Sequence, residues 1–372
     1  MEYKRLGDIA TYINGYPFKP EDRGLTGLPI IRIQDLTGNS YDLGFYNGNY
    51  PERIEINDGD VLISWSASLG VYIWNKGKAL LNQHIFKVAF DKCEVNKQFF
   101  VYAVQYKLQE MGAKAHGATM KHIVKKDFDN TAIPFPALEE QEKIAQTMNR
   151  ISRIISDRQQ QLQKLDELVK ARFVELFGDP ISNSHALPEA TLPELGEFGR
   201  GVSKHRPRND PKLLGGKYPL IQTGDVASAN LYITSYTTTY SELGLTQSKM
   251  WDKGTLCITI AANIAKTAIL NFDACFPDSI VGFSANGRTN NIFIHYWFSF
   301  FQEILESQAP ESAQKNINLK ILSELKVIVP AKEKQDVFAA FVEQTDKSKV
   351  AVQKALDEAQ LLFDSLMQKY FG

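Results

Sequence analysis

The stretch from Leu138 to Gly178 reads LEEQEKIAQTMNRISRIISDRQQQLQKLDELVKARFVELFG and contains no glycine or proline before its last residue. Apolar residues recur in it at alternating steps of four and three, which is the spacing of a helix that packs against another helix. Acidic residues follow Leu138 closely, where the positive end of a helix dipole favours them, and Gly178 with Pro180 ends the helix. At ~1.5 Å per residue this helix would be roughly 55 to 60 Å long, which indicates a spacer between two globular parts.

The C-terminal stretch predicts a second copy of this helix. FPALEEQEKI at 135–144 aligns with VPAKEKQDVF at 329–338, and the same shift aligns Leu-Phe-Gly at 176–178 with Tyr-Phe-Gly at 370–372. We expect the two helices to pair along matched seams. The seam residues are Ile151, Ile155, Leu162, Leu165, Val169 and Leu176 in the first helix, with arginines at 158 and 172, and Val352, Leu356, Ala359, Phe363, Leu366 and Tyr370 in the second.

The duplication extends to the parts that precede each helix. Residues 29–36 match 219–226, residues 58–64 match 253–259, and residues 83–85 fall on 278–280. Apolar, β-branched and aromatic runs predict strands at 28–33, 60–64, 71–74 and 80–90, and similar runs follow in the second copy. Asn96 and Asn290 lie where a helix is expected to begin in each copy.

These patterns predict an α+β chain of two pseudo-repeated α/β domains separated by two long helices that form an antiparallel coiled coil. The expected boundaries are residues 1–137 for the first domain, 138–178 for the central helix, 179–331 for the second domain and 332–372 for the C-terminal helix. The chain therefore contains an internal repeat, and the repeated unit is one domain with the long helix that follows it.

The composition is that of ordinary globular material, with 372 residues, 44% hydrophobic and 23% charged. The three cysteines show no CxxC spacing, so we expect neither a disulfide framework nor a metal site, and a reducing cytoplasm fits. A leader and a long apolar run are both missing, so we expect no membrane association. Because the net charge is only −1, any surface for nucleic acid must be local.

The arrangement resembles the specificity subunits of type I restriction-modification systems. LGDIATYINGYPF at 6–18, DGDVLIS at 58–64 and PFPALEEQEKIA at 134–145, followed by a long helix that ends in Leu-Phe-Gly-Asp, carry the resemblance over essentially the whole chain. The second helix departs from the family pattern, because residues 331–335 read AKEKQ where the fuller form contains Leu-Glu-Glu-Gln.

The resemblance implies two target-recognition domains, each of which reads one half of a bipartite site in double-stranded DNA. It implies a coiled coil that sets the spacer and docks two modification (methyltransferase) subunits. It also implies that this chain is not an enzyme and binds no cofactor, with adenosylmethionine held by the modification subunit. The target sequence, the spacer length and the presence of a restriction (nuclease and translocase) subunit stay open.

Two basic stretches are candidates for contacts with DNA phosphates. Residues 111–126 include Lys114, His116, Lys121 and His122 and contain no acid, and residues 200–217 include Lys204, Arg206 and Arg208 with a single acid, Asp210. Local clusters of this kind attract the DNA backbone. The alternative for either stretch is a charged loop that is only solvated.

Base readout needs paired donors and acceptors, such as Arg for guanine and Asn or Gln for adenine. The candidates at strand ends or in loops are Arg32, Gln34, Asn82, Gln83 and His84 in the first copy, and Gln222, Thr223, Asn263, Lys266, Lys315 and Asn316 in the second. The loop at 117–123 aligns with 311–317 and adds Thr119 and Gln314. In both copies this loop leads to an isoleucine that we expect to be buried. An Asn or Gln in a turn often bonds its own backbone instead.

Catalytic motifs are missing from the sequence. No GxGxxG follows a strand, no Asn-Pro-Pro-aromatic or GxSxG motif occurs, and the histidines lack ligand spacing. Pro277-Asp278 and Glu324-Leu325-Lys326 resemble parts of a nuclease motif but lie too far apart for one hairpin. The alternative function is a coiled-coil adaptor that holds two protein-binding domains apart without DNA. Divergent loops in the two copies favour two different DNA half-sites.

Overall fold

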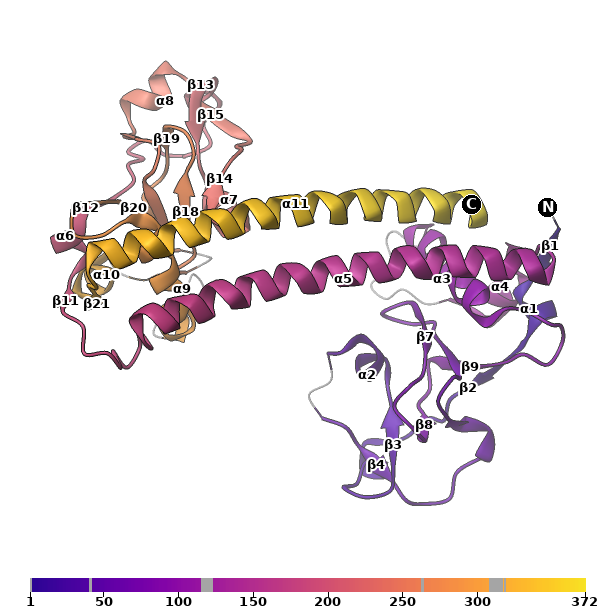
Figure 1. Ribbon diagram of the computed structural model, residues 1–372. Helices are drawn as coiled ribbons and strands as arrows, with labels where there is room; N and C mark the ends of the chain where they lie inside the picture. Colours follow the sequence, from indigo (N-terminus) through magenta and orange to yellow (C-terminus); the bar gives the residue numbers. More distant parts are fainter. Residues whose placement is uncertain (1, 40–41, 115–122, 262–263, 308–316, 318) are drawn as a thin grey trace. The chain divides into compact units, whose positions relative to one another are not determined.

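The computed structural model describes the chain except for residues 1, 40–41, 115–122, 262–263, 308–316 and 318. The chain forms two compact units, Met1–Arg158 with Ala355–Gly372, and Gln159–Lys354. Each unit holds one globular domain and one part of each of two long helices (Figure 1). The predicted boundaries separated domains from helices, whereas the structural units join each domain to the helix segments that pack on it.

The first domain contains two four-stranded sheets. The sheet β2-β9-β6-β7 is antiparallel and lies nearer the helices, and the sheet β4-β3-β8-β5, in which β3 and β8 are parallel, lies farther out (Figure 1). The pair β1-β10 joins the start of the domain to the segment before the long helix. The elements are β1 Tyr3–Arg5, α1 Leu6–Ile9, β2 Thr11–Asn14, η1 Pro20–Asp22, β3 Leu28–Ile31, α2 Ile33–Thr37, β4 Phe45–Tyr46, η2 Glu52–Ile54, β5 Glu55–Ile56, β6 Val61–Ser64, β7 Gly70–Ile73, β8 Ala79–Leu81, β9 Ile85–Ala89, α3 Lys97–Lys114, α4 Lys125–Asn130 and β10 Ala132–Pro134.

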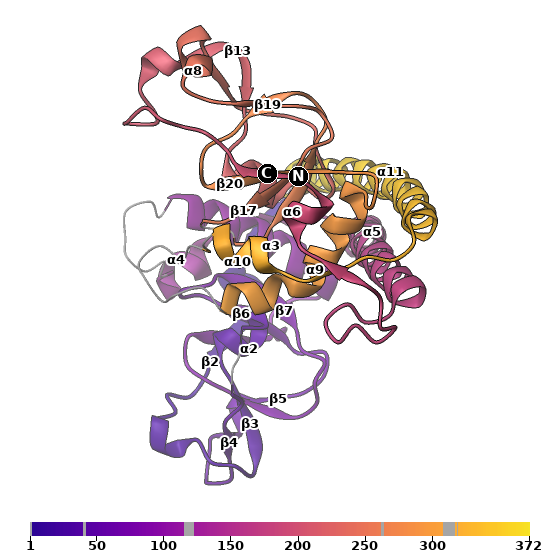
Figure 2. The same cartoon turned by 90° about the vertical axis from the view of Figure 1, so that its left-hand side faces the viewer.

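The second domain repeats this strand order. Its sheets are β12-β20-β17-β18-β14, beside the helices, and β15-β13-β19-β16, farther out (Figure 2), and β11-β21 is the short pair. The one addition is β14, which pairs in parallel with β18. The elements are β11 Glu189–Ala190, α6 Leu192–Leu195, β12 Gly196–Arg200, η3 Pro211–Leu213, β13 Leu214–Leu220, α7 Thr223–Ser228, β14 Tyr232–Ile233, β15 Thr238–Tyr240, α8 Glu242–Thr246, β16 Met250–Trp251, β17 Leu256–Thr259, β18 Thr267–Leu270, β19 Ala274–Cys275, β20 Ile280–Ala285, α9 Asn291–Ser307, α10 Leu319–Glu324 and β21 Val327–Ile328.

The prediction of one strand at 80–90 was wrong, because two strands occupy it. β8 pairs in parallel with β3 in the outer sheet, and β9 pairs antiparallel with β2 and β6 in the inner sheet. Between them His84 has a φ of 71°, in the left-handed region that a strand does not pass through. The turn at 82–84 therefore carries the chain from one sheet to the other.

The helices α3 and α9 begin where the sequence predicts. The Asn96 side chain accepts from the backbone N–H of Phe99 at 3.0 Å, and Asn290 accepts from Phe293 at 2.8 Å. Each asparagine thus satisfies a backbone N–H that the first turn of a helix leaves without a partner. The helix caps are equivalent in the two domains.

The long helices are α5, Leu138–Phe177, and α11, Lys332–Phe371. Gly178 follows α5 with a φ of 76°, the left-handed conformation that ends many helices. All the predicted seam residues are buried or half-buried, while most of the positions between them are exposed. None of the helices in the described part of the chain has an apolar run long enough to cross a membrane.

Each unit pairs opposite ends of the two helices. In the first unit Met148 near the start of α5 shares a core with Met367 and Phe371 near the end of α11. In the second unit Phe173 near the end of α5 packs against Phe338 near the start of α11, with ring centroids 5.4 Å apart. The segments therefore run antiparallel in both units, as predicted.

A buried glutamine lies at the start of each long helix. The Gln141 amide donates to the Pro136 carbonyl at 2.8 Å and accepts from the Asn96 N–H at 3.0 Å. The equivalent Gln335 donates to the carbonyls of Pro330 at 2.8 Å and Arg288 at 3.0 Å, and accepts from the Thr289 hydroxyl at 2.8 Å. Each glutamine therefore joins a long helix to the segment before it and to the start of α3 or α9. This contact explains why the glutamine is present in both copies of the motif, although the neighbouring residues differ.

We expect Gln335→Ala to lower the free energy of unfolding by about 1 to 3 kcal/mol, because the substitution leaves buried carbonyl and hydroxyl groups without partners. Chemical denaturation of the purified chain measures this change. Gln344→Ala, at an exposed position of the same helix, is the matched control and should change stability little. Equal effects of the two substitutions would contradict the role given to Gln335.

Candidate nucleic-acid interface

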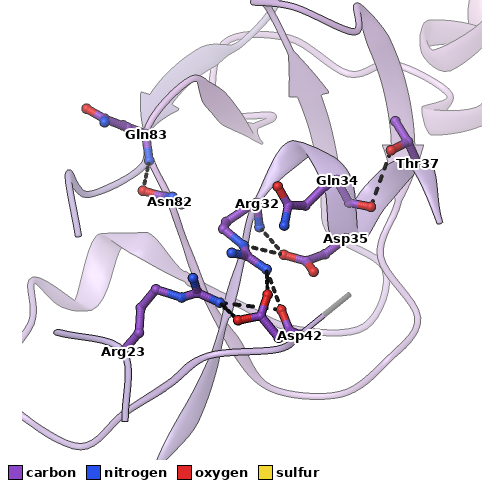
Figure 3. Close-up of polar contacts among 8 residues, drawn as sticks. All are labelled: Arg23, Arg32, Gln34, Asp35, Thr37, Asp42, Asn82 and Gln83. Atoms are coloured by element: carbon purple, nitrogen blue, oxygen red, sulfur yellow. Dashed lines mark hydrogen bonds and ion pairs between the residues drawn. The ribbon is translucent and has the colours of Figure 1, made fainter. Parts of the chain in front are cut away.

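The predicted base-reading residues of the first domain follow two parallel strands. Arg32 comes directly after β3 and Asn82 directly after β8, and the Asn82 N–H donates to the Ile31 carbonyl at 3.0 Å. The fold therefore brings Arg32 and Gln34 close to Asn82 and Gln83 (Figure 3). Polar side chains gather at the carboxyl ends of the parallel pair, an edge where open sheets often bind ligands.

The Arg32 guanidinium is engaged inside the domain. Its Nε donates to Asp35 at 3.2 Å and its Nη2 lies 3.5 Å from a carboxylate oxygen of Asp42, so that only 16% of the side chain is exposed. Arg23 approaches the other oxygen of Asp42 at 2.7 Å (Figure 3). The hydrogen bond from Arg23, reinforced by Arg32, holds the pKa of Asp42 below its ordinary value. With its oxygen turned inward, Gln34 accepts from Arg32 at 2.9 Å. This network holds Arg32 to the body of the domain.

The turn at 82–84 presents its residues in different ways. The Asn82 side chain accepts from the Gln83 N–H at 2.8 Å, so the alternative considered for a turn asparagine applies to it. The Gln83 side chain is exposed. The His84 ring is half-buried and lies edge-on to Trp65, with centroids 5.0 Å apart. Of these three residues, Gln83 is the most accessible to a partner.

The second domain places its candidates on the equivalent edge. Gln222 is exposed before α7, and its N–H donates to Asp225 at 2.7 Å, as the Arg32 N–H does to Asp35. Thr223 follows it as the first residue of the helix. Lys266, just before β18, donates to the Gln302 amide at 3.1 Å. The backbone frame is repeated, while the side chains on it differ.

The segment between β12 and β13, residues 201–213, is the basic loop. Arg206 and Arg208 both pair with Asp278, one on each carboxylate oxygen, and the Arg206 contact is 3.2 Å. Lys204 is exposed, and in the described part of the chain no carboxylate pairs with it. The equivalent segment of the first domain is 15–27, because Gly15 and Gly201 make the same backbone bonds to Ile85 and Ile280. The two basic stretches seen in the sequence are therefore different elements of the fold.

Nine predicted residues cannot be placed by their side chains. Lys114 is the last residue of α3, and the structure does not describe its side chain. The other eight lie wholly outside the described residues: His116, Thr119, Lys121, His122, Asn263, Gln314, Lys315 and Asn316. The residues after the two aligned loops are equivalent, since Ile123 donates to Trp65 at 3.0 Å and Ile317 to Ile260 at 2.9 Å. Both isoleucines are buried, as predicted. Trp65 and Ile260 in turn donate to the carbonyls of His84 and Ser279, so the two isoleucines lie beside the turn between the sheets.

Sequence reasoning missed the acidic partners of the arginines. Arg23 and Asp42 are far apart in the sequence and carry no motif. Asp278 was considered only as part of a nuclease-like Pro-Asp pair, whereas its carboxylate holds Arg206 and Arg208. The alignment of Asp278 with Gln83, a predicted base-reading residue, was the one signal in the sequence that could have marked Asp278 as part of the site. Among the described residues no group of three or more His, Cys, Asp or Glu side chains could hold a metal ion.

Known proteins resemble this chain over nearly its whole length. The family model for the type I restriction modification DNA specificity domain matches residues 1–167 and again 189–359. The EcoBI type I restriction enzyme specificity subunit of Escherichia coli is 24% identical, over 98% of this chain and 84% of its own length. The MjaX specificity subunit of Methanocaldococcus jannaschii is 22% identical, over 95% of this chain and 90% of its own.

Solved structures share the fold. The S subunit of a type I restriction-modification system from M. genitalium superposes with a TM-score of 0.62 at 18% identity, covering 100% of this chain and 96% of that one. A chain from a structure described for complex assembly and conformational transition of the type I R-M system has a TM-score of 0.59 at 17% identity, covering 99% and 97%. With the family model matching both halves, the chain belongs to the type I restriction-modification DNA specificity family.

Proposed function

We propose that the chain is the DNA-specificity subunit of a type I restriction-modification complex and that each globular domain reads one half of a bipartite site. The observation that carries the proposal is the repeated edge. In both domains the residues after two parallel strands and the turn between the sheets form one frame, and the side chains on that frame differ. A repeated frame with different side chains is suited to two different base sequences.

Different exposed side chains suit contacts with DNA phosphates and contacts with base edges. Lys204 carries an accessible charge without a carboxylate partner among the described residues, which suits a phosphate. Gln83 and Gln222 are exposed on the edge and carry amides, which suit adenine. Arg32, whose side chain is only 16% exposed, is less accessible than Gln83 and Gln222.

The long helices set the distance between the half-sites and dock the modification subunits. A groove of about 930 Å³ in the first unit is lined by α5 residues from Lys143 to Asp157 and by Leu362 and Leu366 of α11. Ile154 and Leu362 in this groove are 41% and 51% exposed. Apolar side chains exposed on a helical pair favour contact with another protein, here a modification subunit.

The chain contributes recognition and no chemistry. Adenosylmethionine would be held by the modification subunit, and a cytoplasmic complex follows from the proposal. The alternative, a coiled-coil adaptor that binds no DNA, predicts that changes in the two domains leave the methylated sequence unaltered. The following experiments separate the two functions.

Replacing residues 1–137 by the corresponding domain of a family member with a different site should change one half of the methylated sequence and keep the other. Methylome sequencing of cells that carry the exchanged chain and its modification subunit gives the result. Exchange of residues 179–331 is the matched control and should change the opposite half. Loss of both halves in either exchange would count against independent reading.

Lys204→Ala should lower the slope of log affinity against log salt concentration by about 0.9, because one phosphate contact is lost. DNA binding by the assembled complex at several salt concentrations measures the slope. Lys217→Ala is the control, since Glu242 already neutralises Lys217 at 3.1 Å. An unchanged slope for Lys204→Ala would show that the basic loop does not touch the DNA backbone.

Four residues inserted after Gln160, with four more at the matching position after Lys354, should lengthen the unspecified spacer by about one or two base pairs. The insertion adds ~6 Å of helix at ~1.5 Å per residue and disturbs the seam only as a stutter, and base pairs rise ~3.4 Å. The matching position is counted from the Asp166–Lys349 ion pair. Methylated adenines mapped by long-read sequencing give the spacer.

The control for this experiment replaces residues 159–161 by alanine without changing the length, and it should keep the original spacer. An active insertion variant with an unchanged spacer would show that the helices do not set the distance. Failure of the variant to assemble would instead show that the seam does not accept the added turn.

A further inference from the structure

The two domains use their arginines differently. In the first domain Arg23 and Arg32 share Asp42, and their side chains are 28% and 16% exposed. In the second domain Arg206 and Arg208 share Asp278, and their side chains are 54% and 44% exposed. The arginine side chains of this pairing are thus more covered in the first domain than in the second, although Asp42 is itself 67% exposed and Asp278 33%.

The backbone around Asp278 is fixed by close contacts. Asp278 lies in the turn from β19 to β20, at the position that Gln83 occupies in the first domain. A Cβ at Gly201 would come within 2.3 Å of the Phe276 carbonyl oxygen and 2.4 Å of that of Pro277, so only glycine permits this approach. The start of the basic loop therefore lies directly on the turn that carries the carboxylate.

The basic loop is fastened on its other side as well. The backbone N–H groups of Lys204 and His205 donate to the Gln247 carbonyl and amide oxygens at 3.3 and 3.0 Å. The Arg206 Nη1 donates to the carbonyls of Ser203 at 2.5 Å and His205 at 2.9 Å. With its Nη2 on Asp278, Arg206 has several of its donors occupied and helps to hold the loop in shape.

Arg208 has one hydrogen-bond partner among the described residues. Its Nη2 donates to Asp278, whereas a guanidinium has five N–H donors. The pairing with Asp278 limits the positions of the side chain without covering it. Arg208 is therefore both oriented and open, which is the condition for two parallel hydrogen bonds to a guanine edge.

The charge around Arg208 distinguishes a base from a phosphate. A carboxylate next to the guanidinium repels the full negative charge of a phosphate more strongly than the partial charges on the edge of a neutral base. No carboxylate among the described residues pairs with Lys204, so its charge suits a phosphate of the DNA backbone. The net charge of the basic loop is still positive. Residues 201–213 contain four lysine or arginine residues and one acidic residue, whereas residues 15–27 contain two of each.

We propose that Arg208 reads a guanine in the half-site of the second domain and that Asp278 is the positioning residue that aims it. The inference rests on the proposed function and adds the base, the half-site and the two residues. Because Gln83 takes the place of Asp278 in the first domain, the first half-site lacks this reader. Asp278 acts only through the arginines and makes no contact with the base.

The test uses the chain assembled with its modification subunit, after methylome sequencing has given the wild-type site. Arg208→Lys keeps the charge but loses the planar fork, and Asp278→Asn keeps the shape but loses the charge. We expect both variants to relax discrimination at the same G·C pair of the second half-site by about 5- to 150-fold. In both variants the first half-site should stay as in the wild type, and in Arg208→Lys, which keeps the charge, the slope of affinity against salt should also stay as in the wild type.

Lys204→Ala is the matched control, and it should weaken binding to all sequences alike without relaxing any position. Wild-type recognition by Arg208→Lys would overturn the proposal, because a lysine replaces an arginine well at a phosphate and poorly at a guanine. An unchanged recognition site in Asp278→Asn would overturn the positioning role of Asp278. Relaxed discrimination in the first half-site would contradict the assignment of Arg208 and Asp278 to the second half-site.

The outcomes separate this inference from the proposed function. A wild-type complex without a bipartite methylated site would contradict the proposed function itself. A bipartite site that both variants leave unaltered would contradict only the assignment of Arg208 and Asp278. Circular dichroism and assembly with the modification subunit show that each variant is folded, and Arg208→Lys, an exposed substitution of like charge, is expected to pass both checks.

Discussion

The buried glutamine at the start of each long helix is the contact on which the rest of the structure depends. Gln141 and Gln335 each occupy a site with almost no exposure and bond the proline carbonyl that precedes the helix. Their remaining bonds reach the residues just before α3 and α9, and these two helices pack on the inner sheets. Because a buried amide is stable only when its donors and acceptors are satisfied, this contact fixes where each helix leaves its domain.

With the helix start fixed, the position of the candidate interface follows from the strands. In each domain a parallel pair in the outer sheet ends at one edge, and the turn from the outer to the inner sheet passes beside it. The residue after each aligned loop bonds the neighbouring strand at this same place. Segments far apart in the sequence thus contribute side chains to one edge, and the two domains differ mainly in which side chains these are.

The arginines show how a repeated frame gives unequal surfaces. In the first domain the buried Asp35 and the exposed Asp42 together hold Arg32, whose side chain is 16% exposed. Asp278 holds Arg206 and Arg208 at the surface of the second domain, where the groups stay accessible. Since an exposed ion pair contributes little to stability, the pairing in the second domain is better explained by orientation of the side chains than by stabilisation.

The sequence by itself determined the duplication, the fold class, the two long helices and the asparagine caps of α3 and α9, because periodicity and capping are local properties of the chain. It also indicated the edge at 32–34 and 82–84. Only the tertiary structure decided that 80–90 is two strands, that the two basic stretches are different elements, and that Arg32 is held inside while Arg208 is open. The physical reason is that each of these depends on a partner distant in the sequence, such as β3 for β8 or Asp278 for Arg208, and local patterns carry no information about such partners.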